Sequence, residues 1–138
     1  MTCNFNIPKP SSMPCSPASL DDSETNWAGA ASRFQAARAA EEAYDKAVWM
    51  PALRASKDGG PNIPDHVEAK MEALAAARYA VEGQWILTPA PSLHDVIAKI
   101  QYCRERWEGF EWPLSWWTSI MTDLGRIAVE AATEGKVQ

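Results

Sequence analysis

The sequence predicts an all-α protein, and three observations support this prediction. Apolar residues recur at three- and four-residue steps through most of the chain, which is the period of an amphipathic helix. Alanine, the strongest helix former, is frequent between the charged residues. No stretch shows the alternating pattern rich in Val, Ile and Thr that is typical of a strand. We expect a three- to four-helix antiparallel bundle in one domain, residues 21–138, after a disordered Pro/Ser-rich tail, residues 1–20.

Residues 1–20 differ in composition from the rest of the chain. Pro8, Pro10, Pro14 and Pro17 lie among Ser, Asn and Lys residues, with few large apolar side chains. Proline locks φ and removes a backbone donor, and there is little apolar burial to offset the entropy of ordering. We therefore expect a mobile tail that is dispensable for folding. Its alternative use is as an arm that becomes ordered on a partner.

A long first helix is expected from about Asp22. Its apolar face consists of residues at helical spacing, Trp27, Ala30, Ala31, Phe34, Ala37, Tyr44, Ala47 and Val48. The ring of Pro51 would clash with the carbonyl of Ala47, so a kink or a break is expected near residues 49–50. The glycines and the proline within residues 56–62 then end the helix.

The second helix is expected to begin near Asn62, which can cap it, with Pro64 in its first turn. Its buried face is a seam with alternating steps of four and three residues, Val67, Met71, Leu74, Arg78, Val81 and Trp85. Arg78 is the one polar member of this seam. The prolines within residues 88–91 end the helix.

The third helix has the clearest start, because Ser92 can cap it and Asp95 follows three residues later. Its apolar stripe is expected to be Leu93, Val96, Ile97, Ile100, Cys103 and Trp107, with Lys99 facing away. Residues 109–113 form a turn. The fourth helix is expected to bury Trp117, Ile120, Met121, Leu124, Ile127, Ala128 and Ala131. Short connections favour antiparallel neighbours.

Length and composition indicate the class of protein. With 138 residues, 46% hydrophobic and 22% charged, the chain is expected to form one globular domain. The net charge is −5 and no segment is a basic patch, so the sequence does not favour a nucleic-acid partner. The three cysteines lack short spacings, and the chain has neither a signal-peptide pattern nor an apolar run of about 18 residues. We expect a soluble, cytoplasmic protein without membrane association.

The sequence contains none of the motifs that carry catalysis, metal binding or cofactor binding. His66 and His94 lack metal-ligand spacing and are expected to face solvent in the first turns of their helices. Cys103 lies on an apolar stripe, where a cysteine is usually a small buried hydrophobe. The acidic residues within 41–45 are expected to form a solvated face with helical ion pairs. We therefore expect no enzyme activity, no metal and no cofactor.

Four of the seven tryptophans lie around the predicted turn between the third and fourth helices. Trp107 and Trp117 fall on the apolar stripes of their helices and are expected in the core. Trp112, in the turn, and Trp116, one position off the stripe, are less easily buried by the same packing. With Phe110 they form either an exposed aromatic patch that binds protein or a local core that caps the turn. The candidate protein-binding residues are Phe110, Trp112 and Trp116.

One segment carries a family resemblance. Residues 87–93, Leu-Thr-Pro-Ala-Pro-Ser-Leu, lead into Val-Ile-Ala-Lys-Ile at 96–100 and follow an alanine-rich helix that contains Tyr79. This pattern, over about residues 64–107, resembles small helical proteins of unknown function from bacterial prophages and their hosts. No active residues can be carried over from that group. The resemblance implies a bacterial or phage cytoplasmic setting and an accessory role.

These observations favour a non-enzymatic helical protein-interaction module, for instance a phage-associated accessory or inhibitor protein. It would bind another protein or a second copy of itself, as a homodimer, through the aromatic patch. The sequence is also compatible with a monomer. Two alternatives remain, a small nucleic-acid-binding regulator and an enzyme whose residues come together only in the fold.

Overall fold

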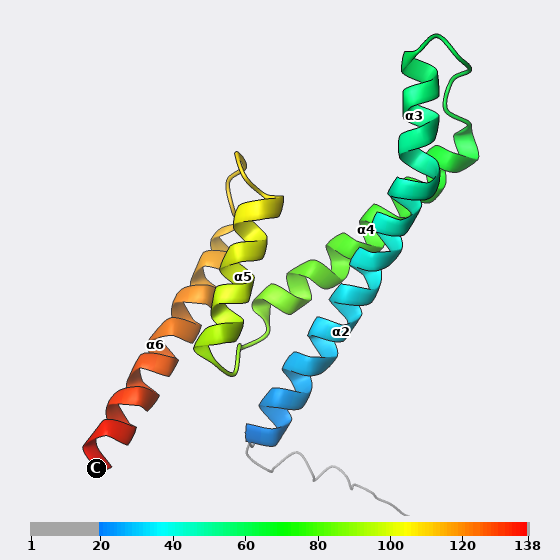
Figure 1. Cartoon of the computed structure of the whole chain (residues 1–138). Helices are drawn as coiled ribbons and strands as arrows, with labels where there is room; N and C mark the ends of the chain where they lie inside the picture. Colours follow the sequence, from blue (N-terminus) through cyan, green and yellow to red (C-terminus); the bar gives the residue numbers. More distant parts are fainter. Residues whose placement is uncertain (1–19, 138) are drawn as a thin grey trace, which may run out of the picture.

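The computed structural model describes residues 20–137 of the chain, and the side chains of residues 26–135 within them. The described part is all-helical and contains no strand, as the sequence predicted. The elements are α2 (Leu20–Tyr44), the π-helix η3 (Asp45–Trp49), α3 (Met50–Lys57), α4 (Asp65–Leu87), α5 (Leu93–Arg106) and α6 (Leu114–Val137) (Figure 1). The expected tail, residues 1–20, lies outside the described residues except for Leu20, at which α2 begins.

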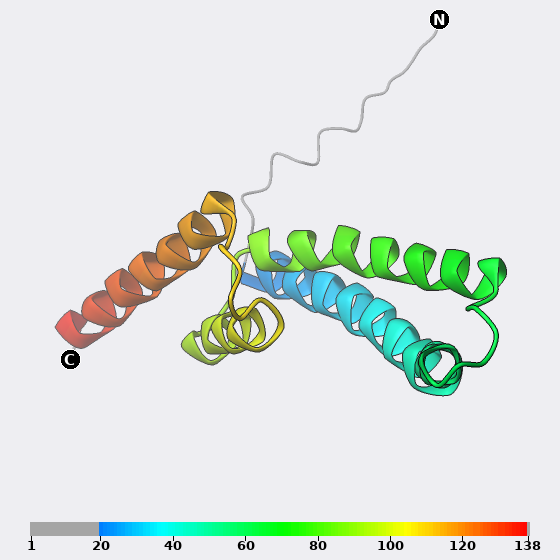
Figure 2. The ribbon, with the colours of Figure 1, turned by 90° about the horizontal axis from the view of Figure 1, so that it is seen from above.

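The helices form two antiparallel pairs (Figures 1 and 2). In the first pair, α2 with its extension α3 runs alongside α4, and in the second α5 runs alongside α6. The pairs meet where the second half of α4 passes α5 and α6. There the ring of Phe34 in α2 stacks on Trp85 of α4 at 4.7 Å and meets Tyr102 of α5 edge-on at 4.9 Å. The other end of the first pair, with α3, extends away from α5 and α6 (Figure 1).

The core lies at this meeting point and draws on all four long helices. Its larger cluster consists of Ala30, Phe34, Trp85, Ile86, Tyr102, Cys103 and Trp116, and a smaller one of Ala90, Val96 and Ile120. The aromatic rings are the largest side chains of the larger cluster, and alanine contributes little buried area per residue. Single-residue truncation of such aromatic side chains typically costs about 3–5 kcal/mol.

The three predicted breaks between helices are confirmed. Gly59 and Gly109 take positive φ values of 88° and 83°, which a residue with a side chain adopts only with strain. Ser92 caps α5, accepting from the backbone N–H of Asp95 at 3.3 Å while its hydroxyl donates to the Asp95 carboxylate at 2.8 Å. The expected cap at Asn62 is wrong, because α4 begins after Pro64 without a side-chain cap.

Pro51 is accommodated by a change of helix type. The backbone N–H of Met50 donates to the carbonyl of Asp45, a bond to the fifth residue back that marks the π-helix. The wider turn lies directly before Pro51, where the ring would otherwise clash with a carbonyl of a regular α-helix. The sequence thus located the irregularity at the correct turn, while the bend of the first helix stays a prediction.

The buried faces of α5 and α6 differ from the predicted stripes. On α6 the buried residues are Trp116, Ile120 and Asp123, whereas Trp117 is 46% exposed. On α5 the side chain predicted to face away, Lys99, is completely buried. The physical reason is that Lys99 and Asp123 pair with each other, so both helices turn a charged residue inward that an apolar pattern assigns to solvent.

Candidate functional site

The turn between α5 and α6 is built around Trp107. This residue ends α5, and the backbone N–H of Phe110 donates to its carbonyl at 3.0 Å, which closes the turn with Gly109 in its left-handed conformation. The half-buried indole meets Trp116 edge-on at 5.6 Å and Phe110 at 6.0 Å. Trp107 therefore connects the core to the exposed tip of the turn.

The structure separates the three predicted site residues. Phe110 is 68% exposed, as a surface residue must be. Trp112 is half-buried and stacks on Trp117 at 4.5 Å, with the ring planes 20° apart. Trp116 is only 5% exposed and belongs to the core, so its predicted surface position is wrong. Trp117, predicted for the core, takes the exposed position because α6 is rotated by about one residue relative to the predicted stripe.

Exposed apolar side chains continue from the turn along α6. Leu114 is 80% exposed and Met121 is 60% exposed, and both share the helix face of Trp117 because the three are spaced three and four residues apart. We call Phe110, Trp112, Leu114, Trp117 and Met121 the aromatic surface. A hollow of about 440 Å³ lies within it, between Glu111 and the residues from Trp112 to Leu114 and Trp117. Contiguous exposed apolar area of this kind usually marks an interaction site.

A shallow groove follows a neighbouring side of α6. It has a volume of about 500 Å³ and is lined by the end of α4 and the first half of α6, Leu87, Pro89, Leu114, Ser115, Thr118, Ser119, Thr122 and Asp123. Its surface is mainly apolar with hydroxyl groups along one wall. Leu114 belongs to both the groove and the aromatic surface, so the two features adjoin.

The described residues contain two buried ionic networks, and the first joins α2, α4 and α5. Arg78 donates from Nε to Glu41 Oε1 at 3.0 Å and from Nη1 to Glu82 Oε2 at 2.9 Å. The hydroxyl of Tyr102 donates to the same Glu82 oxygen, and burial, with this hydrogen bond, raises the pKa of Tyr102. The second oxygen of Glu82 has no partner among the described residues. Arg78 was predicted on the seam of α4 and is indeed buried there.

This network corrects the prediction of a fully solvated acidic face. Glu41 is 8% exposed, whereas Glu42 is exposed and pairs with Arg38 at 2.9 Å as the sequence predicted. Two carboxylates and one guanidinium thus hold the helices together. Because Glu82 is fully enclosed, it is out of reach of a substrate in this conformation.

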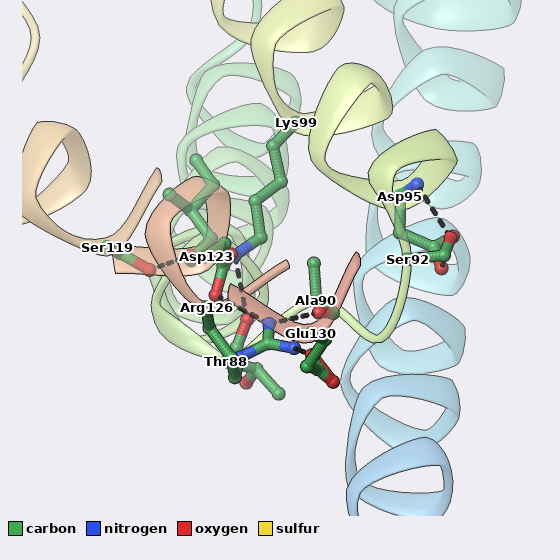
Figure 3. A network of polar contacts seen from close by, with 10 residues as sticks. Thr88, Ala90, Ser92, Asp95, Lys99, Ser119, Asp123, Arg126 and Glu130 are labelled. Carbon is green, nitrogen blue, oxygen red and sulfur yellow. Dashed lines mark hydrogen bonds and ion pairs between the residues drawn. The ribbon is translucent and has the colours of Figure 1, made fainter. Parts of the chain in front are cut away.

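The second network holds the connection between α4 and α5 against α6 (Figure 3). Lys99 Nζ donates to Asp123 Oδ2 and to the carbonyl of Thr88, both at 2.7 Å. Arg126 bridges the other oxygen of Asp123 at 3.3 Å and the carbonyl of Ala90. Burial lowers the pKa of Lys99, against the opposing effect of Asp123. These contacts fix α6, and with it the aromatic surface, on a rigid support.

Other candidate chemistry is not assembled in the described part of the chain. Cys103 is completely buried, and burial raises the pKa of its thiol to about 12, which leaves it protonated at neutral pH. His66 and His94 face solvent as predicted. No group of three His, Cys, Asp or Glu residues is placed to hold a metal ion within residues 26–135.

None of the described helices is both long and apolar enough to cross a membrane.

In comparisons with protein families, curated proteins and solved structures, nothing matches the chain.

Proposed function

We propose that this protein is a non-enzymatic helical module that binds another protein through the aromatic surface. The observation that carries the proposal is the exposure of large apolar side chains on one face of α6 and in the turn that precedes it. Phe110, Leu114 and Met121 are each at least 60% exposed, and Trp117 is nearly half exposed beside them. Leaving this area in water is unfavourable, at about 25 cal/mol per Å² of apolar surface.

The support beneath the surface favours binding over incidental exposure. Trp112 and Trp117 are held in a stacked pair, and the adjacent Trp116 is packed in the core. Rigid aromatic side chains lose little conformational entropy on binding, and tryptophan is enriched among the residues that dominate interface energies. The two ionic networks hold α5 and α6 in place, so the surface is organised before a partner arrives.

The proposal extends to the biological setting. The resemblance of residues 64–107 to small prophage proteins supports an accessory or inhibitory role in a bacterial or phage cytoplasm, with a homodimer or a different protein as the bound state. The scaffold that we propose is an antiparallel helix bundle with a kinked first helix. Nucleic acid is not among the proposed partners, since the net charge is −5.

A pair of matched variants tests this proposal. The double variant Phe110→Ser/Trp117→Ser removes two exposed side chains of the aromatic surface. Leu93→Ser removes an apolar side chain of similar exposure, 50%, from the opposite end of α5. Immobilised full chains would be incubated with extract of the producing cells, and bound proteins identified by mass spectrometry.

We expect the double variant to lose specific partners, or self-association, that the wild type and Leu93→Ser retain. The helical circular dichroism signal should be equal in all three proteins. If the double variant and the wild type bind the same proteins in equal amounts and associate equally, the aromatic surface is not the binding site and the proposal fails.

A further inference from the structure

The long helix α6 has two faces of different chemistry. The four charged residues between its start and Gly135 are Asp123, Arg126, Glu130 and Glu134. Their spacing of three and four residues places them on one side of the helix, the side of Asp123 that faces the core. A solvated surface helix normally carries its charges on the side away from the core. Between Leu114 and Gly135, the outward half of α6 thus lacks the charges that would keep it in water.

A stripe of uncharged residues follows this outward side. Its members are separated by steps of three and four residues, Leu114, Trp117, Met121, Gly125, Ala128, Ala132 and Gly135. All of them are exposed. We call this set the outward stripe. It begins within the aromatic surface and continues to the end of the described side chains.

The last described part of α6, residues 128–135, also lacks support from the rest of the described chain. α6 has 24 residues and its neighbour α5 has 14, so the end of α6 extends beyond α5 (Figures 1 and 2). Every residue within 128–135 is exposed. A short helical segment without tertiary contacts is only marginally stable in water, because most helix stability in proteins comes from packing. A contact along this segment would stabilise it.

The sizes of the side chains on the outward stripe are complementary to those of a second copy of α6. Large residues occupy its first half, and only glycine and alanine occupy its second half. When two copies of α6 are placed antiparallel about an axis near Gly125, Trp117 of one lies opposite Ala132 of the other and Met121 lies opposite Ala128. Leu114 then meets Gly135. Each bulky side chain faces a small one, as close packing of two helices requires.

We propose that a second copy of this chain binds along the outward stripe, with the two α6 helices antiparallel. A two-fold interface must be complementary to itself, and this size pattern has that property. The absence of charge on the stripe means that no like charges are brought together. A Cβ placed on Gly125 meets no atom within 4 Å, so the backbones are free to approach at the axis. The inference rests on the proposed function, since it names the partner of the same surface.

The area of the contact is small. A helix of 24 residues is about 36 Å long, and a stripe about 10 Å wide covers about 360 Å² per copy. The total lies below the size of standard stable interfaces and matches transient ones. We therefore expect a dimer that forms reversibly and whose fraction increases with protein concentration.

Disulfide trapping tests the antiparallel geometry. The variants M121C and A128C would each be made in the full chain carrying C3S and C15S, and oxidised alone and as a mixture. In the antiparallel pair, position 121 of one copy faces position 128 of the other. We expect a cross-linked dimer in the mixture only. In either variant alone, the two thiols are offset by seven residues, about 10 Å along the helix, too far for a disulfide.

Sedimentation velocity on two single variants, at a matched pair of exposed positions, tests whether a second copy of the chain binds the outward stripe. Ala128→Arg places a charge on the outward stripe, whereas Thr133→Arg places the same charge about 140° around the helix from it. We expect Ala128→Arg to weaken the dimer by about tenfold or more, because a guanidinium would be buried without a partner, and Thr133→Arg to behave as the wild type. Equal circular dichroism and melting curves would show that both variants fold.

Three results would overturn the second-copy inference: a wild-type mass of 15.2 kDa at every concentration, a dimer unaffected by Ala128→Arg, or cross-linking of M121C alone at the rate of the mixture. If the wild type stays monomeric but captures another protein through Phe110 and Trp117, this inference fails while the proposed function stands. If neither self-association nor capture depends on these residues, both fail.

Discussion

Replacing Asp123 by Ala should lower the free energy of unfolding by about 3–5 kcal/mol, the usual cost of removing one partner from a buried ion pair. Lys99 would remain in the core with its ammonium group held by the carbonyl of Thr88 and the ring of Trp27, whose centroid lies 5.3 Å from Nζ, but without a counter-charge from Asp123. The side chain of Lys99 is completely buried and that of Asp123 is 3% exposed, so water cannot replace the lost carboxylate. Arg126 would also lose one of its three partners and keep the carbonyl of Ala90 and the carboxylate of Glu130.

An exposed pair in the same chain provides the control. Arg38 and Glu42 lie 2.9 Å apart, almost as close as the buried pair at 2.7 Å, but their side chains are 37% and 63% exposed. Glu42→Ala should therefore cost about 0.5 kcal/mol or less, the value for helical surface pairs. The difference in unfolding free energy between the two variants therefore reports mainly the burial of the ion pair, because the N–O distances of the two pairs are nearly equal.

Urea denaturation at pH 7, followed by circular dichroism, measures both variants. The double variant Lys99→Met/Asp123→Leu should recover most of the loss, since an apolar pair of similar volume removes both buried charges. If Asp123→Ala and Glu42→Ala unfold at the same urea concentration, the assignment of Lys99 and Asp123 to the core is wrong.

The pKa of Lys99 adds a pH dependence with a definite sign. Burial lowers this pKa below the value of the unfolded chain, 10.5, and Asp123 opposes the shift. Without Asp123 the folded protein should release the Lys99 proton at still lower pH, while the unfolded chain keeps it. Stability therefore rises with pH between the two pKa values. The loss caused by Asp123→Ala should be smaller at pH 9 than at pH 7, whereas that of Glu42→Ala should not change in this way.

Three further predictions concern other parts of the core. Arg78→Leu should cost about 3–5 kcal/mol, because the fully buried carboxylate of Glu82 loses its cation; a loss below about 1 kcal/mol in urea titration would contradict the network. Trp116→Ala should cost about 3–5 kcal/mol and Trp117→Ala clearly less; the reverse order of melting temperatures would restore the stripe predicted from sequence. The buried thiol of Cys103, with its pKa raised to about 12, should not react with a disulfide reagent at pH 8 until the protein unfolds, measured in a variant without the other two cysteines.

The helix boundaries could be predicted from sequence because local chemistry determines them. Ser92 caps a helix through its own hydroxyl, and Gly109 supplies a left-handed residue where a helix stops. The seam of α4 was also predictable, including Arg78, since its period is clear over six positions. These features depend on residues that are near one another in the chain.

The orientation of α5 and α6 was not predictable from apolar spacing alone. Lys99 and Asp123 are placed inside by a contact between two helices, and a sequence read alone assigns charged residues to solvent. Because of this error, Trp117 was predicted on the buried stripe of α6, whereas the structure buries Trp116 there. One signal was present, because Asp123 lies three residues after Ile120 and seven after Trp116, on the same helix face. Glu82, four residues after Arg78, offers the same kind of signal for the first network.

Hydrogen–deuterium exchange along α6 at two protein concentrations tests most directly that its outward side is a contact surface. Residues 128–135 are exposed and without support in the single chain, so their amides should exchange rapidly when the protein is dilute. At high concentration the amides of this segment should become protected, while those of α5 keep the same rates. Identical exchange of α6 at both concentrations would contradict the proposed pairing.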